Sequence, residues 1–149
     1  MSQKVLELGW DVLEKLKEAL PRIERPDIVV GILRGGAAPA VLASHYFDVP
    51  VKWYTSKSYE NRTKSQLVEF EPLDLTQEDV LGRKVLLIDD VLETGETMLA
   101  VGEHLQSLSG TEPIRLVLVQ KKLENIDVPV FSLLAIDPAI WVVFPWEAT

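Results

Sequence analysis

Short runs of apolar residues alternate along this sequence with segments whose apolar residues recur at helical spacing. Most of the runs are continuous and rich in β-branched residues, which is typical of strands covered on both faces. They occupy residues 28–33, 51–55, 84–89, 114–120 and 130–136. Helical spacing occupies residues 5–20, 39–47 and 93–108. Strands that alternate with helices predict one α/β domain over residues 1–149, with a mostly parallel twisted sheet flanked by helices.

The composition excludes several classes of function. The chain has 149 residues, of which 47% are hydrophobic, enough for one core but not two. It has no cysteine, which excludes disulfides, thiolate catalysis and Cys-ligated metals. The net charge of -8 opposes a nucleic-acid partner. Charges interrupt the apolar positions of the first twenty residues, so we expect no signal sequence, no membrane span and a cytoplasmic location.

The sequence VLLIDDVLETGET at residues 85–97 combines a buried strand, an acidic pair and a turn that opens a helix. Open α/β sheets bind ligands at the carboxyl ends of their strands, where Asp89 and Asp90 are expected. Free backbone N–H groups and the hydroxyls of Thr94 and Thr97 favour a phosphate, and Gly95 permits its close approach. Adjacent carboxylates suit ribose hydroxyls or a magnesium ion that the ligand carries. The spacing predicts a site for a sugar phosphate.

Residues 85–97 closely resemble the motif with which type I phosphoribosyltransferases bind phosphoribosyl pyrophosphate (PRPP). Two further matches follow in the order of that family. Arg34-Gly35-Gly36, after a strand, resembles its pyrophosphate loop, and Ser58-Tyr59 resembles the Ser-Tyr pair of its mobile active-site loop. The resemblance implies the type I phosphoribosyltransferase fold with a small C-terminal hood and a mobile loop. It also implies a reaction in which a base nitrogen displaces pyrophosphate from PRPP.

The resemblance assigns contacts with PRPP to particular residues. Asp89 and Asp90 would bind the ribose hydroxyls and position Mg²⁺, whereas Arg34 and Gly35 would hold the pyrophosphate. Ser58 and Tyr59 would close over the site and exclude water. The 5'-phosphate would be cradled by Glu93, Thr94, Gly95, Glu96 and Thr97.

Two of these residues would be catalytic. Arg34 would neutralise the leaving pyrophosphate, and Glu93 would act as the base that faces the purine's N7 proton. Many family members carry Asp at the position of Glu93. Glu96 replaces a glycine that the phosphate loop often has, and we expect its carboxylate to point outward because it would repel a bound phosphate.

The 6-oxopurine branch of the family supplies the expected base contacts. It uses a lysine at the end of a late strand, for which Lys121 is the first choice and Lys122 the alternate. The tail IWVVFPWE resembles the hood of the xanthine and guanine enzymes, with Trp141 stacking on the base and Val142 supplying backbone contacts. For Trp146 the sequence does not separate a role in the site from packing.

Several alternatives stay open from the sequence. A non-catalytic PRPP or nucleotide sensor of the same fold is the alternative function, although relatives that bind nucleic acid need a basic surface. A phospho-receiver domain also has an acidic pair after a buried strand, but there the pair lies near the first strand. A pyrimidine acceptor and the choice among hypoxanthine, guanine and xanthine are undecided. The family resemblance further implies a homodimer, with PRPP, a purine base and a nucleoside monophosphate as partners.

Overall fold

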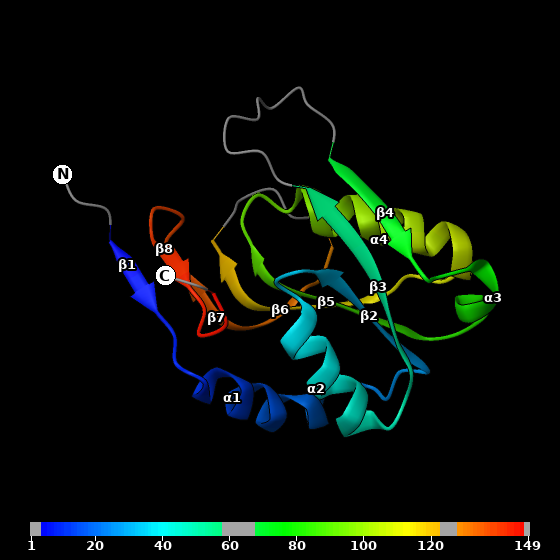
Figure 1. Cartoon of the computed structure of the whole chain (residues 1–149), viewed down its shortest axis with the longest axis horizontal. Helices are drawn as coiled ribbons and strands as arrows, with labels where there is room; N and C mark the ends of the chain where they lie inside the picture. Colours follow the sequence, from blue (N-terminus) through cyan, green and yellow to red (C-terminus); the bar gives the residue numbers. More distant parts are fainter. Residues whose placement is uncertain (1–3, 58–67, 123–127, 148–149) are drawn as a thin grey trace.

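The computed structural model describes residues 4–57, 68–122 and 128–147, which form a central six-stranded sheet, a separate two-stranded sheet and flanking helices (Figure 1). The strands are β1 (Val5–Glu7), β2 (Ile28–Leu33), β3 (Val51–Lys57), β4 (Glu69–Leu73), β5 (Val85–Leu92), β6 (Ile114–Lys121), β7 (Phe131–Ile136) and β8 (Trp141–Val143). The helices are α1 (Asp11–Ala19), a 3₁₀ turn at Leu20–Arg22, α2 (Ala37–Phe47), α3 (Gln77–Val80) and α4 (Glu96–Ser109). Among the described residues, no helix has both the length and the apolar character needed to cross a bilayer.

The large sheet has the strand order β4-β3-β2-β5-β6-β7. Its neighbours run parallel, except that β4 pairs antiparallel with β3. The predicted α/β fold with a mostly parallel sheet is therefore confirmed. Chain order reverses between β2 and β5, so the loops that follow these two strands separate and leave a crevice at their carboxyl ends.

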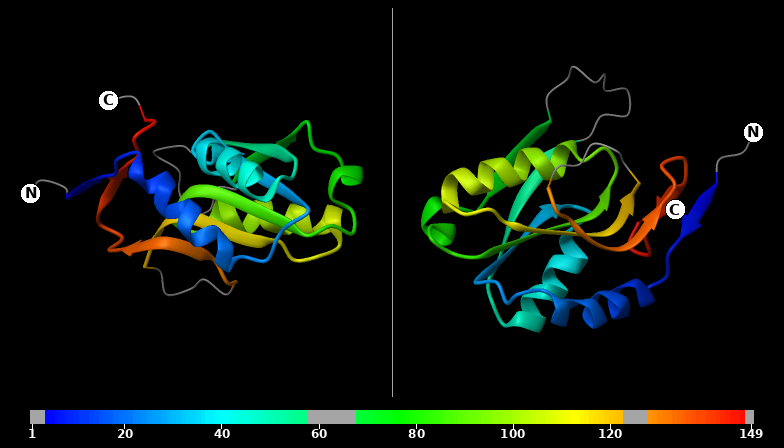
Figure 2. Two further views of the ribbon diagram at one scale, coloured as in Figure 1. Left: turned by 90° about the horizontal axis from the view of Figure 1, so that it is seen from below. Right: turned by 180° about the vertical axis from the view of Figure 1, so that it is seen from behind.

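Helices cover both faces of this sheet, and each face has its own apolar core (Figure 2). Alternate residues of a strand point to opposite faces. On β2, Val29 joins the core under α1 and α2, whereas Ile28 and Val30 join the core under α3 and α4. Burial on both faces explains why the strands are continuous apolar runs rather than alternating patterns.

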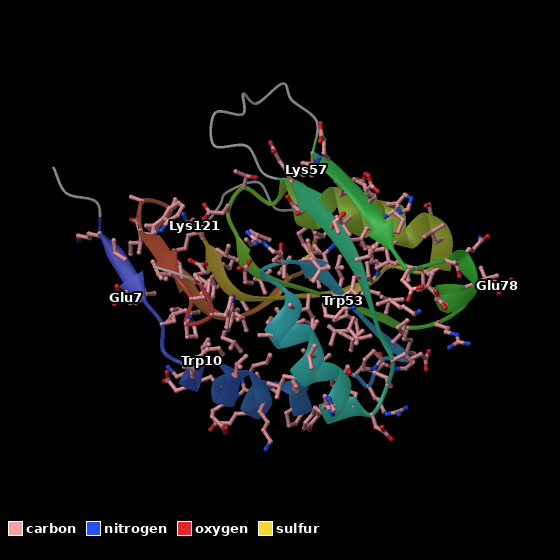
Figure 3. The ribbon with its side chains drawn as sticks, in the orientation of Figure 1. Glu7, Trp10, Trp53, Lys57, Glu78 and Lys121 are labelled. Atoms are coloured by element: carbon pink, nitrogen blue, oxygen red, sulfur yellow. The ribbon has the colours of Figure 1, made fainter. Side chains whose placement is uncertain are left out.

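Close packing on one face requires a glycine in β2. A Cβ at Gly31 would lie 2.7 Å from both the Cβ of Ala40 on α2 and the ring of Trp53 on β3. Figure 3 shows Trp53 among the side chains that fill the space beside α2. Gly31 therefore lets α2 approach the strand whose end forms the ligand crevice.

The N-terminal segment differs from the predicted helix over residues 5–20. Val5–Glu7 forms β1, which pairs in parallel with β8, and helix α1 begins only at Asp11. The tail's backbone supplies hydrogen-bond partners to residues 5–7, and this pairing decides between strand and helix, because two apolar residues fit either period. The expected C-terminal hood is thus a small sheet built from both ends of the chain, and the two termini lie on the same side of the molecule (Figure 2).

Candidate functional site

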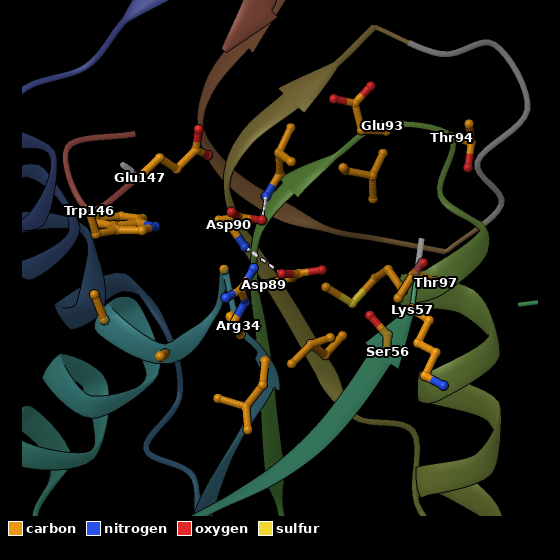
Figure 4. A pocket seen from close by; sticks show the side chains of 18 of the residues that line it. Arg34, Ser56, Lys57, Asp89, Asp90, Glu93, Thr94, Thr97, Trp146 and Glu147 are labelled. Atoms are coloured by element: carbon orange, nitrogen blue, oxygen red, sulfur yellow. Dashed lines mark hydrogen bonds between the residues drawn. The ribbon is translucent and has the colours of Figure 1, made fainter. Parts of the chain in front are cut away.

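A cavity of about 1160 Å³ lies at the carboxyl ends of β2, β3 and β5 (Figure 4). Its polar lining comes from the turn after β2, the end of β3, the end of β5, the turn before α4 and the segment after β8. These residues are Arg34, Gly35, Ser56, Lys57, Asp89, Asp90, Glu93, Thr94, Gly95, Thr97, Trp146 and Glu147. Most of the residues that the sequence assigns to a PRPP site are therefore gathered in one place.

The turn between β2 and α2 packs directly on the acidic pair. A Cβ at Gly35 would lie 2.1 Å from Oδ2 of Asp90, so only glycine fits beside this carboxylate. A Cβ at Gly36 would lie 2.7 Å from the carbonyl oxygens of Ile32 and Ile88. The Leu33–Arg34 peptide is cis, and Arg34 is exposed on the cavity wall.

Asp89 and Asp90 lie within β5, which continues beyond them to Leu92. Oδ1 of Asp89 accepts the N–H of Asp90 at 2.8 Å, and Oδ1 of Asp90 accepts the N–H of Val91 at 2.7 Å (Figure 4). Burial, followed by the charge of Asp90, raises the pKa of Asp89 well above its usual range. Burial also raises the pKa of Asp90. The pair is thus held in fixed rotamers in an environment that disfavours two uncompensated negative charges.

The turn before α4 has the geometry of an anion cradle. Gly95 has φ 87°, a left-handed conformation that favours glycine, and α4 begins at the next residue. Oγ1 of Thr94 accepts the N–H of Glu96 at 3.3 Å. Thr94, Gly95 and Thr97 line the cavity, whereas Glu96 is not among its lining residues. The N-terminus of a fourteen-residue helix therefore faces the space in front of the acidic pair.

Glu93 is paired with the lysine that was expected to contact a base. Nζ of Lys121, at the end of β6, lies 2.7 Å from Oε2 of Glu93. Lys121 is only 5% exposed, whereas Lys122 is exposed and its N–H bonds to the carbonyl of Ile136. The structure therefore brings Lys121, and not its neighbour, to the carboxylate on the cavity wall.

The hood segment reaches the cavity through a different tryptophan. Trp141 is 51% exposed on β8 and Val142 is buried there, and neither lines the cavity. Trp146 does, stacked on Phe144 with ring centroids 5.1 Å apart. Ser58 and Tyr59 lie outside the described residues.

Sequence reasoning missed three polar residues on the cavity wall, Ser56, Lys57 and Glu147, and left the role of Trp146 open. Ser56 and Lys57 follow directly on the run at residues 51–55, so their place at a strand end was a usable signal. Glu147 had no such signal, because its position depends on how the tail folds back. Burial and the charge of Asp90 raise the pKa of the Glu147 carboxyl, which places it in the same electrostatic environment as the acidic pair.

Comparison with known proteins identifies this arrangement. A family model described as a phosphoribosyl transferase domain matches residues 11–149. The chain belongs to the phosphoribosyltransferase family. A solved purine phosphoribosyltransferase from Pyrococcus horikoshii shares this fold with a TM-score of 0.76 and 29% identity, over 98% of this chain and 96% of that one. The type I phosphoribosyltransferase fold expected from the sequence is therefore confirmed.

Relatives of this phosphoribosyltransferase chain carry different functions. A xanthine-guanine phosphoribosyltransferase from Chromohalobacter salexigens is 31% identical over 94% of this chain and 82% of its own length. An orotate phosphoribosyltransferase from Pyrobaculum islandicum is also 31% identical, but over 69% of this chain, which spans only about half of that enzyme (48%). A transcriptional regulator, GfcR of Methanococcus vannielii, is 27% identical over 85% of this chain and 66% of its own. Family membership therefore leaves the substrate to be argued from the site.

Proposed function

We propose that this protein transfers the 5-phosphoribosyl group from PRPP to a 6-oxopurine base and releases pyrophosphate. One observation carries the proposal: a single cavity brings together the Arg34-Gly35 turn, the acidic pair, the phosphate cradle and a carboxylate paired with a buried lysine. Each part suits a different portion of the two substrates. The purine relatives among the comparisons agree with this assignment.

Each group on the cavity wall would bind a different part of PRPP. The cradle at residues 94–97 would hold the 5'-phosphate through backbone N–H groups, while Asp89 and Asp90 would accept hydrogen bonds from the ribose hydroxyls. As the glycosidic bond to pyrophosphate breaks, positive charge develops on the sugar, and the nearby carboxylates stabilise it. Arg34 would stabilise the opposite charge on the leaving pyrophosphate. Catalysis would therefore rest on positioning and electrostatics.

A magnesium ion fits this site as a companion of the substrate. Among the described residues, no cluster of three or more acidic or histidine side chains could hold a metal ion. The Asp89 and Asp90 carboxylates are adjacent protein oxygens in the cavity, and a bound cation would offset the cost of burying their negative charge, which raises both pKa values. Magnesium commonly binds through one or two carboxylates and the phosphates of its substrate. When bound, it would neutralise charge on the pyrophosphate.

The Glu93 and Lys121 pair would read the edge of the base. A lysine donates hydrogen bonds and cannot accept them, so Lys121 suits a 6-oxo group rather than a 6-amino group. The Glu93 carboxylate is an acceptor, and would accept a hydrogen bond, and then the proton, from N7 of the purine. The carboxylate is already held 2.7 Å from Nζ, so both groups are positioned before the base arrives.

The test is pyrophosphate release from PRPP and Mg²⁺ with hypoxanthine, guanine, xanthine, adenine, uracil and orotate, each measured alone. We expect release with one or more of the three oxopurines and background rates with adenine, uracil and orotate. The Asp90→Asn variant is the blank. Release with orotate or uracil alone would assign a pyrimidine acceptor. Tight PRPP binding without release from any base would instead favour a non-catalytic sensor; one relative is named as a transcriptional regulator.

Lys121→Ala is expected to lower kcat/KM for the oxopurine by roughly 10- to 100-fold, the loss that removal of a charge-assisted hydrogen bond of about 1.5–3 kcal/mol causes. The KM for PRPP should stay within about twofold, because Lys121 does not line the phosphate cradle. Lys122→Ala is the matched control: its side chain is exposed and should be dispensable. Equal losses in the two variants would contradict the assignment of Lys121.

A further inference from the structure

Three aromatic side chains meet behind the phosphate cradle, on the face of the sheet that α4 covers. The hydroxyl of Tyr54 lies 2.8 Å from Nδ1 of His104. The ring of Phe70 lies 6.0 Å from that of Tyr54 and 5.7 Å from that of His104. Tyr54 comes from β3, Phe70 from β4 and His104 from α4. The cluster therefore joins the edge hairpin of the sheet to the helix that starts at the cradle.

Both residues of the Tyr54 and His104 pair lie on elements that also line the cavity. On β3, Ser56 follows Tyr54 by two residues, so it shares the same face about 7 Å further along. On α4, Thr97 precedes His104 by seven residues, so it lies on the same stripe of the helix about 10 Å away. Ser56 and Thr97 both line the cavity. A link between Tyr54 and His104 thus sets the spacing between the end of β3 and the first turn of α4, which both line the cavity.

Tyr54 is fully buried, and burial raises the pKa of its hydroxyl to about 12. The hydroxyl therefore stays protonated at neutral pH and can donate to Nδ1 when the ring proton of His104 is on Nε2. Apolar packing is not directional, whereas a hydrogen bond fixes distance and angle. The hairpin needs such a restraint because β4 is an edge strand that pairs with β3 alone in the described sheet.

We propose that the Tyr54 and His104 pair is a positioning contact of the PRPP site. It holds the end of β3, with Ser56 and Lys57, at the right distance from the first turn of α4. Neither residue touches the cavity, so the pair acts through the walls it joins. This role rests on the proposed function, since it presumes that PRPP occupies the cavity that these two elements line.

The experiment measures the Kd of PRPP with Mg²⁺ by titration calorimetry, together with Tm, for the full chain and four variants. Tyr54→Phe removes the hydroxyl and keeps the ring, and His104→Leu removes the acceptor. We expect each to weaken PRPP binding about fivefold, the factor that one net hydrogen bond provides. The double variant should lose no more than either single one, because the two residues share one interaction. His104→Asn should rescue the affinity to within about twofold, since its amide oxygen supplies an acceptor near the position of Nδ1.

The outcomes separate positioning from ordinary stability. A lower Tm with unchanged Kd in Tyr54→Phe would overturn the positioning role and leave the pair as a packing contact. Additive losses in the double variant would also overturn it. If His104→Leu does not fold, Tyr54→Phe and His104→Asn still decide the question. A wild-type chain that does not bind PRPP at all would refute the proposed function itself, which is a different result from equal binding by all variants.

Discussion

Asp90→Asn should lower kcat/KM by about 10²- to 10³-fold, the range for removing one preorganised electrostatic group from an active site. The carboxylate lies beside Gly35 in the cavity, where it would face both a ribose hydroxyl and the developing positive charge of the sugar. Asn keeps an oxygen that can accept the N–H of Val91, so the local backbone should be retained. Pyrophosphate release under saturating base measures the loss. Arg34→Ala, in the turn that packs on the acidic pair, should cause a loss of similar size.

Asp90→Asn is also expected to be more stable than the wild type at neutral pH. This stability measurement is the control, because it separates a loss of turnover from a loss of the fold. Burial raises the pKa of Asp90 in the folded state, so between the unfolded and the folded pKa the folded protein holds a proton that the unfolded chain has released. Stability therefore falls as pH rises through that window. Asn has no charge to bury, and Tm at pH 7 should rise by roughly 2–4 °C, the shift that about 1 kcal/mol causes in a domain near this size. Near-normal turnover in both Asp90→Asn and Arg34→Ala would show that the site is assigned wrongly.

The acidic pair and the cradle could be predicted because they are continuous in sequence. Residues 85–97 contain a buried strand, two carboxylates and a Gly-containing turn. Because these parts are neighbours in the chain, their relative positions follow from local structure alone. The contact between Gly35 and Asp90 is different, because it needs β2 and β5 to be neighbours. Local periodicity does not specify the order of strands in a sheet. This contact could therefore be predicted only through the family resemblance.

The structure of the hood and the pairing of Glu93 with Lys121 depend on contacts between distant residues, which no local sequence pattern encodes. Residues 5–7 are too few to distinguish a strand from a helical turn, and the partner that makes them a strand lies 136 residues later. For the same reason the sequence pointed to Trp141, whereas Trp146 is the hood tryptophan that lines the cavity. The choice between Lys121 and Lys122 depended on a one-residue register, since a shift by one moves every side chain of a strand to the other face. The ion pair with Glu93 resolves that register for the described structure.

Glu93→Gln is expected to lower kcat by about 10²-fold or more, the contribution of a positioned general base, while the Kd of PRPP stays within about twofold. Gln keeps the length and one acceptor oxygen of Glu, but loses the negative charge and the capacity to take a proton. Lys121 then keeps a hydrogen-bond partner, so its position should change little. Single-turnover kinetics with saturating PRPP would measure the chemical step apart from product release.

Glu96→Gln is the matched control for that change. It also removes one negative charge near the start of α4, but from a side chain that does not line the cavity. Its effect on kcat should stay within about fivefold, as expected for an interaction with a helix terminus worth ~0.3–1 kcal/mol. A loss of equal size in kcat and in PRPP affinity for Glu93→Gln would contradict a base role, because a group that only holds PRPP affects binding as much as chemistry. A loss confined to kcat would place the proton transfer at Glu93, since the phosphate cradle and the acidic pair are unchanged in this variant.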